Sequence, residues 1–310
     1  MAKFSIISDA SCDFNTELRE RFGMDAVIFS QVMFPDGHSE QADPDWNNID
    51  PNAYYGSMVD KKLRYQSSAP GIENVKNVFR AELEKGNDIF CATLSSGMSA
   101  VYEQCCLARK ELLEEYPERT IRVIDSKRYS TAAGLLCLYA AQLRSEGKSV
   151  DETADYIESK LDCIHQSGWM DDLFFLARAG RLSKGTAFMG TMIGVKPMAD
   201  FNMDTGRFQV IGKARGVNKA LAAVVEYLKA TIEKPEDQIV FVAHSLRQEY
   251  AERLADRIRE EVSPKEVITN WIGQSSGANI GPGLVAAFYF GKPLSKDLTE
   301  EAAVLQNILK

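Results

Sequence analysis

The chain has 310 residues, of which 45% are hydrophobic and 26% are charged, and its formal net charge is −8 at pH 7. This length is about twice that of a typical single domain, which favours two domains with separate cores. The negative charge opposes a phosphate backbone and no basic stripe compensates for it, so we expect no nucleic-acid partner. No apolar run approaches the roughly 18 residues of a membrane span, which predicts a soluble protein without an integral membrane segment.

The N-terminus enters a short apolar strand at residues 4–7 after a single lysine. It lacks the long apolar segment and the small-residue cleavage site of a signal peptide, which predicts a cytoplasmic protein. The six cysteines are scattered without a Cys-x-x-Cys pair, and most fall on expected buried strands or helix faces. Free cysteine acts there as a small hydrophobic residue, so we expect neither disulfides nor structural zinc.

The first half of the chain alternates strand and helix signals. Short apolar runs at residues 4–7, 88–94 and 121–124 are flanked by turn residues, as expected for strands covered on both faces. Helical patterns cover residues 100–115 and 132–143. The resulting order β, α, β, α predicts an α/β fold with a largely parallel, doubly wound sheet and helices on both faces.

The second half carries six strand signals and two strong helical patterns. A turn signal, Asp-Thr-Gly, lies within residues 201–208 and predicts a hairpin between its flanks. One helical pattern begins at Val217, and the other begins at Leu246 with strict fourfold spacing. The strand signals cover residues 173–176, 197–201, 208–211, 239–243, 267–272 and 284–290.

The two halves predict two α/β domains. A helix is expected from Asp151 to about His165, and we place the domain boundary near residue 165. The N-terminal α/β domain then covers residues 1–165, and a C-terminal domain with a mixed α/β sheet covers residues 166–310. A ligand could lie between them.

Open parallel sheets bind ligands at the carboxyl ends of their strands, so the loops after the apolar runs are the candidate sites. Three of them, residues 8–11, 95–99 and 277–283, are rich in Ser and Gly. The turn at residues 95–99 opens into a helix, whose unpaired N–H groups would attract a carboxylate or a phosphate. A commoner explanation from spacing alone is that Ser96 or Ser99 caps the helix. Neither a P-loop nor a Gly-x-Gly-x-x-Gly fingerprint is present.

Two further segments could contribute to an anionic or apolar site. Arg178 and Arg181 follow an expected strand in a Gly-containing turn and could pair with an anion, although surface arginines in turns are commoner. Residues 186–195 are apolar all round and include Met189 and Met192, whose flexible thioethers suit an irregular apolar ligand. Core packing explains that segment equally well.

No constellation for catalysis is visible. The three histidines, His38, His165 and His244, have no neighbouring nucleophile or metal motif. Asp9 and Asp13 have no second acidic or His cluster that would complete a ligand set. We therefore expect no catalytic residue, no metal and no cofactor.

Six segments in register resemble elements of the DegV family, and together they span nearly the whole chain. Residues 8–13 are similar to its opening Asp-Ser-Thr-Ala-Asp element, and residues 66–70 to Lys-Thr-Ser-Gln-Pro. Residues 95–102 resemble its Ser-Ser-x-Leu-Ser-Gly-Thr-Tyr turn. The remaining three segments are Ala-Gly-Arg-Leu-Ser-Lys at residues 179–184, which is similar to Gly-Gly-Arg-Ile-Ser-Lys; Lys-Pro at residues 196–197, which is similar to the end of Ile-Lys-Pro; and Gly-Pro-Gly at residues 281–283, which is similar to the end of His-x-Gly-Pro-Gly.

This resemblance implies a protein that binds one long-chain fatty acid, such as palmitate or oleate, between two α/β domains. It implies that hydroxyls of Ser67 and Ser99 hold the carboxylate, and that a separate fatty acid kinase converts it to acyl phosphate for phospholipid synthesis. The protein would then be a carrier rather than an enzyme. The ligand-binding residues expected from the matching loops are Ser67, Ser99, Ser68, Ser96, Arg181, Asn279 and Asp9.

Three positions depart from the family pattern. Ser67 replaces Thr and keeps the hydroxyl, while Ala179 replaces a Gly that could need positive φ. Asn279 replaces His; it can still donate a hydrogen bond but cannot titrate near neutral pH. Two alternatives therefore stay open: a lipid-responsive interaction protein without a kinase, and an enzyme acting on another small anion.

Overall fold

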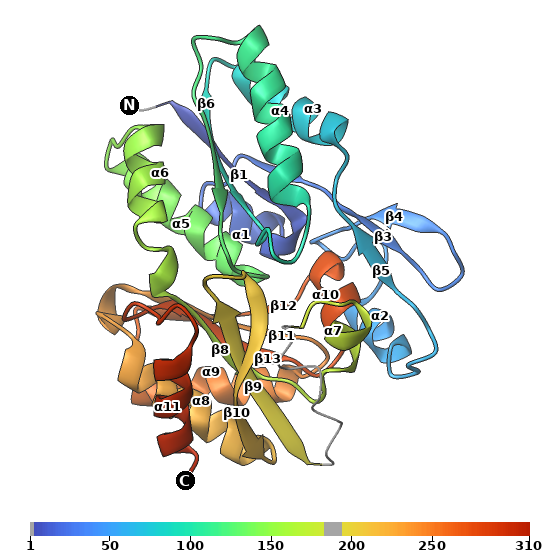
Figure 1. The fold of residues 1–310 in the computed structure, drawn as a ribbon, viewed down its shortest axis with the longest axis vertical. Helices are drawn as coiled ribbons and strands as arrows, with labels where there is room; N and C mark the ends of the chain where they lie inside the picture. The colour runs from blue at the N-terminus through green and yellow to red at the C-terminus, as the bar shows by residue number, and fades with distance from the viewer. Residues whose placement is uncertain (1–2, 183–193) are drawn as a thin grey trace. The chain divides into compact units, whose positions relative to one another are not determined.

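The computed structural model describes residues 3–182 and 194–310, and the chain forms two compact units (Figure 1). Both units are discontinuous in sequence. Unit 1 comprises Met1–Asn47, Gln66–Leu161 and Gly273–Ser276, and unit 2 comprises Asn48–Tyr65, Asp162–Ile272 and Gly277–Lys310. A division into continuous domains near residue 165 stays a prediction.

Unit 1 is built on a parallel four-stranded sheet in the order β2-β1-β6-β7. Short runs of apolar residues form its buried centre because both faces are covered. The parallel doubly wound sheet predicted from the alternating pattern is confirmed. Its strands are β1 (Phe4–Asp9), β2 (Ala26–Ile28), β6 (Asp88–Thr93) and β7 (Ile121–Asp125).

Two helix pairs cover the opposite faces of this sheet (Figure 1). One pair is α3 (Ile72–Leu83) with α4 (Val101–Glu115), and the other is α5 (Thr131–Ser145) with α6 (Val150–Glu158). Ser149 caps α6 in a reciprocal capping box with Glu152. Unit 1 also contains the short helices η1 (Ala10–Cys12) and α1 (Thr16–Arg21).

The helix expected to reach His165 ends earlier, at Glu158. His165 lies instead in β8 (Ile164–Trp169), with only 1% of its surface exposed. Its ring lies 2.8 Å from the Lys292 carbonyl and stacks on Tyr289, which explains how a polar side chain is accommodated in a buried strand.

A second sheet in unit 1 was not predicted. It is antiparallel, in the order β4-β3-β5, and consists of β3 (Gln31–Met33), β4 (Ser39–Gln41) and β5 (Gln66–Ser68). Three-residue strands made largely of polar residues carry no alternating apolar pattern, so the sequence gives no signal for them. β5 carries two of the candidate residues, Ser67 and Ser68.

Unit 2 is built on a mixed six-stranded sheet in the order β10-β9-β8-β13-β11-β12. Among these six strands, β11 and β12 pair in parallel and the other neighbours pair antiparallel, and the predicted hairpin joins β9 to β10. Besides β8, its strands are β9 (Val195–Asn202), β10 (Arg207–Arg215), β11 (Ile239–His244), β12 (Glu266–Trp271) and β13 (Val285–Phe290).

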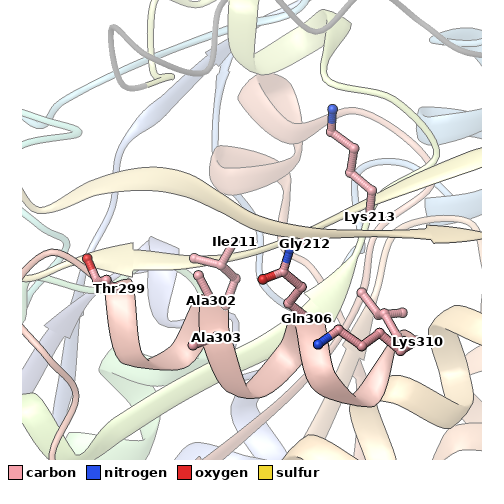
Figure 2. Close-up of a pocket in the computed structure, with 9 residues that line it drawn as sticks. Ile211, Gly212, Lys213, Thr299, Ala302, Ala303, Gln306 and Lys310 are labelled. Atoms are coloured by element: carbon pink, nitrogen blue, oxygen red, sulfur yellow. The ribbon is translucent and has the colours of Figure 1, made fainter.

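The helices α8 (Val217–Thr231), α9 (Gln248–Glu261) and α11 (Thr299–Ile308) pack with this sheet to form the core of unit 2. Leu246 lies before the start of α9, in a left-handed conformation with a φ of 55°. The predicted helix, which was expected to begin at Leu246, therefore begins later in the chain. Gly212 in β10 lets α11 approach, because a Cβ there would lie 2.5 Å from Leu305. Residues of β10 and α11, which Figure 2 draws as sticks, line a pocket of about 690 Å³ beside this contact.

The strand predicted at residues 173–176 is wrong, because the segment forms the short helix α7 (Phe174–Arg178). A run of four apolar residues fits either a strand or one helical turn, and period alone does not separate them. Unit 2 also contains α2 (Pro51–Ser57), and α10 (Gln274–Ile280) contributes residues to both units. Among the described residues, no helix is long and apolar enough to cross a membrane.

Candidate functional site

The carboxyl ends of β1, β6 and β7 lie at the same edge of the parallel sheet, and Asp9 links two of them. Its buried carboxylate accepts hydrogen bonds from the N–H groups of Ser11 at 2.9 Å and Leu94 at 2.8 Å. Burial raises the pKa of Asp9, and these hydrogen bonds oppose the rise. Asp9 therefore connects the loop after β1 to the loop after β6, and its role at this edge of the sheet is structural.

Asp13 links the same edge to residues that come much later in the chain. Its carboxylate accepts hydrogen bonds from the Gly273 N–H at 2.9 Å and from the Ser130 hydroxyl. Gly is required at position 273, since a Cβ would lie 2.7 Å from the Asp13 carboxylate. Burial raises the pKa of Asp13 to about 8, although hydrogen bonds from Ser130, Gly273 and Ser276 lower it.

The raised pKa of Asp13 predicts a pH dependence of stability. The unfolded chain releases this proton near the ordinary pKa, whereas the folded chain keeps it, so raising the pH from about 4 to 8 favours unfolding. We expect the free energy of unfolding of the wild type to fall by about 1.4 kcal/mol for each pH unit in this range, and Asp13→Asn to abolish that fall. Urea unfolding at several pH values measures the slope, with the exposed Asp204→Asn as control; identical slopes in Asp13→Asn and wild type would contradict the assignment.

The turn at residues 95–99 is held by a partner that sequence spacing does not show. Ser96 donates through its hydroxyl to the Asp125 carboxylate, and its N–H donates to the same carboxylate at 3.0 Å. Burial alone would raise the pKa of Asp125, but hydrogen bonds from Ser96 and Lys127 outweigh it and hold that pKa below its ordinary value. Ser96 therefore fastens the turn to the end of β7 and does not cap α4.

Ser99 is engaged much more weakly. Its hydroxyl accepts one long hydrogen bond, at 3.4 Å, from the Val101 N–H. The N-cap of α4 is Ala100, which supplies no side-chain hydrogen bond, and the N–H groups of Tyr102 and Glu103 have no acceptor within the described residues. A half-buried hydroxyl thus stands at the uncapped start of a fifteen-residue helix, where a carboxylate is favoured.

The other predicted residue of unit 1, Ser67, lies in the middle of β5 opposite Val32. Ser67 is half-buried and its neighbour Ser68 is exposed. Because residues alternate along a strand, these two hydroxyls point to opposite faces of the small sheet. Only one of them can therefore face a given ligand.

In unit 2, Arg181 follows α7 and donates to the Ala179 carbonyl at 3.0 Å; it forms no ion pair with any described residue. Arg178 is committed instead to the Lys61 and Leu63 carbonyls. Ala179 has a φ of −75°, while Gly180 has a φ of 69°. The replacement of Gly by Ala at position 179 therefore does not strain the turn.

Asn279 lies in the last turn of α10 and is half-buried. The Gly-Pro-Gly turn follows, with φ values of 70° at Gly281 and 111° at Gly283. A Cβ at Gly281 would lie 2.2 Å from the Phe175 ring, so both glycines are required by conformation and by space. The turn is a close-packed element rather than an open loop.

The predicted apolar segment at residues 186–195 lies almost entirely outside the described residues, as do the Ser183 and Lys184 positions of the family motif. Within the described parts of the chain, no cluster of three His, Cys, Asp or Glu side chains could hold a metal ion. His244 packs against Trp271, and burial lowers its pKa to about 4, so its ring is neutral near pH 7.

Comparison with known proteins bears on these loops directly. A family model described as an uncharacterised protein of the DegV family matches residues 3–292. The chain belongs to the DegV family. A DegV domain-containing protein of Clostridium perfringens (strain 13 / Type A) is 31% identical over 291 residues, which cover 94% of this chain and 98% of that protein. The resemblance seen in the six motifs is confirmed.

Solved structures confirm the α/β fold of this DegV protein. A fatty-acid-binding DegV family protein from Thermus thermophilus has a TM-score of 0.82 at 24% identity, covering 93% of this chain and 99% of that one. The Streptococcus pneumoniae fatty acid kinase (Fak) B3 protein, loaded with linoleic acid, has a TM-score of 0.78 at 20% identity, covering 94% and 100%. At these identities the likeness establishes the fold.

Proposed function

We propose that this DegV protein binds one long-chain fatty acid, such as palmitate or oleate, and holds its carboxylate with the hydroxyls of Ser67 and Ser99. The observation that carries the proposal is the weakly engaged Ser99 hydroxyl at the uncapped start of α4. Two proteins of the same fold carry fatty acids, which supports that ligand over another anion. The other head-group candidates in this proposal are Ser96, Arg181, Asn279 and Asp9, and Ser68 is the alternative to Ser67, because these two hydroxyls point to opposite faces of β5.

Organic extraction of the purified protein, followed by mass spectrometry, tests whether it carries an acyl chain. We expect about one fatty acid per protein molecule after expression in a bacterial host. A protein that releases none, and takes up neither palmitate nor oleate when either is added, is not a fatty-acid carrier.

We further propose that the bound carboxylate is presented in the cytoplasm to a partner kinase, which makes acyl phosphate for phospholipid synthesis. Asn279 stands where the family pattern has His, so the amide would donate a hydrogen bond to the carboxylate without titrating. We expect Asn279→His to change the pH profile of acyl phosphate formation by a kinase from a related bacterium, and to leave oleate affinity within about threefold. An unchanged profile would remove Asn279 from the transfer step.

One alternative is favoured by the same residue. A lipid-responsive interaction protein without a kinase would bind the fatty acid and use the loaded state to recruit another protein. Purification of the tagged protein from its native host, with and without added oleate, separates the two, because the carrier should retain a kinase and the interaction protein should not. An enzyme acting on another small anion gains no support from His165 and His244, which are buried and bonded or stacked.

A further inference from the structure

We propose that Asp171, which no sequence motif singles out, is a positioning residue: it holds the Gly281–Gly283 turn, and with it the end of α10 that carries Asn279, in one arrangement. The inference rests on the proposed function, because it concerns how the carboxylate is presented for transfer. Asp171 itself need not touch the ligand.

The first support is direct contact between Asp171 and the turn. The Asp171 N–H donates to the Gly283 carbonyl at 3.0 Å. A Cβ on Gly283 would lie 2.6 Å from the Asp171 Cβ and 2.9 Å from its Oδ2, so the side chain packs against the glycine backbone. The φ of 111° at Gly283 is one that L residues rarely adopt, and Asp171 therefore packs on the most constrained point of the turn.

The second support is the double ion pair of the Asp171 carboxylate. One oxygen accepts from Lys196 Nζ in β9 at 2.6 Å, and the other accepts from Arg247 Nε at 2.8 Å and from its Nη2. Arg247 is the N-cap residue of α9. One carboxylate thus joins β9, the start of α9 and the turn, and without its charge the two cations would repel each other.

The third support is that the turn is also held from its other side. Gly283 donates its N–H to the Ser245 carbonyl at 2.8 Å, and the Ser245 hydroxyl accepts from the Leu284 N–H at 2.9 Å. The Gly281 N–H closes α10 by donating to the Gly277 carbonyl at 2.7 Å. A displacement of Asp171 would therefore move the last turn of α10 as well, because these hydrogen bonds hold the turn between them on both sides.

The positive charges of Lys196 and Arg247 are partly accessible to solvent. Lys196 and Arg247 line a cavity of about 440 Å³ together with residues of the first turn of α9. Their side chains keep 16% and 32% of their surface exposed. Asp171 therefore sets the direction of two accessible positive charges at the same time as it sets the turn.

A matched pair of variants tests the inference. Asp171→Asn removes the charge, and Asp172→Asn is the control, since the exposed fraction of Asp172 is similar (25% against 22%) and it pairs with one cation, Lys61, at 2.7 Å. Gly283→Ala pushes on the same contact from the other side, with Gly147→Ala as its control, where φ is 86° and a Cβ meets nothing within 4 Å.

The primary readout is the side-chain amide resonance of Asn279 in the unliganded protein. We expect Asp171→Asn and Gly283→Ala to shift or broaden it and both controls to leave it unchanged. The second readout is acyl phosphate formation by a related kinase, where Asp171→Asn should lower kcat by about ten- to a hundredfold, with KM and oleate affinity within about threefold of wild type.

The outcomes separate the two proposals. An Asn279 resonance that ignores Asp171→Asn, or one that responds equally to Asp172→Asn, overturns the positioning role whatever the ligand. A wild-type protein that binds no oleate overturns the proposed function, while the Asn279 resonance still reports on Asp171. A normal kcat in Asp171→Asn, with oleate bound, overturns the positioning role and leaves fatty-acid binding intact.

Discussion

Asp9→Ala is expected to lower the free energy of unfolding by about 2–5 kcal/mol, because two buried N–H groups, those of Ser11 and Leu94, lose their acceptor. Asp9→Asn should cost much less, since the amide oxygen can still accept from one of the two. Urea denaturation of both variants and wild type measures the difference.

This result decides between two roles for Asp9. The loop match to the DegV family places Asp9 among the ligand-binding residues, whereas the geometry gives both carboxylate oxygens a backbone partner. If Asp9→Ala unfolds at the wild-type urea concentration but binds oleate poorly, Asp9 contacts the ligand and the structural role is wrong.

Ser99→Ala is expected to weaken fatty-acid binding by about 1–3 kcal/mol, which is roughly 5- to 150-fold in affinity, if its hydroxyl donates to a desolvated carboxylate. Its stability should change little, because the hydroxyl now accepts only a 3.4 Å hydrogen bond. Titration of the delipidated protein with oleate gives the affinity, and urea unfolding checks the fold.

Ser145→Ala is the matched control for Ser99→Ala. Ser145 lies in the same unit, at the end of α5, and its hydroxyl donates to the Gln142 carbonyl. It should leave oleate affinity unchanged. Equal affinities for wild type and Ser99→Ala would remove Ser99 from the head-group site and shift the carboxylate to the remaining candidates.

The part of the fold that was predictable is the part with strong local periodicity. The strands β1, β6 and β7 are buried apolar runs separated by long helices, and this pattern has few alternatives. The antiparallel β4-β3-β5 sheet was not predictable, because its strands are three residues long and the β3–β5 pairing joins segments more than thirty residues apart.

The division into units shows the same limit. Asn48–Tyr65 belongs to unit 2, although the chain on both sides of it belongs to unit 1. Gly273–Ser276 belongs to unit 1, although the chain on both sides of it belongs to unit 2. The Tyr55 hydroxyl donates to the Ile272 carbonyl at 2.6 Å, although the two residues are 217 positions apart in the sequence. No change in composition near residue 48 indicates this contact. A boundary read along the sequence cannot place such segments.

The position of the candidate serines in the fold was predictable, whereas their hydrogen-bond partners were not. Serines before an expected helix pointed to the start of α4, and Ser99 does lie there. The partner of Ser96 is Asp125, at the end of a strand that adds no motif of its own. Asp171 was missed for a similar reason, since its neighbours Lys196, Arg247 and Gly283 come together only in the folded chain.

The central claim is that a fatty acid is held through its carboxylate. Equilibrium binding of the delipidated protein to oleate, compared with oleyl alcohol of the same chain length, tests it most directly. We expect oleate to bind at least about tenfold more tightly at pH 7.5, and Ser99→Ala to remove most of that difference. Equal affinity for the two ligands, or the same preference in Ser99→Ala, would contradict the assignment.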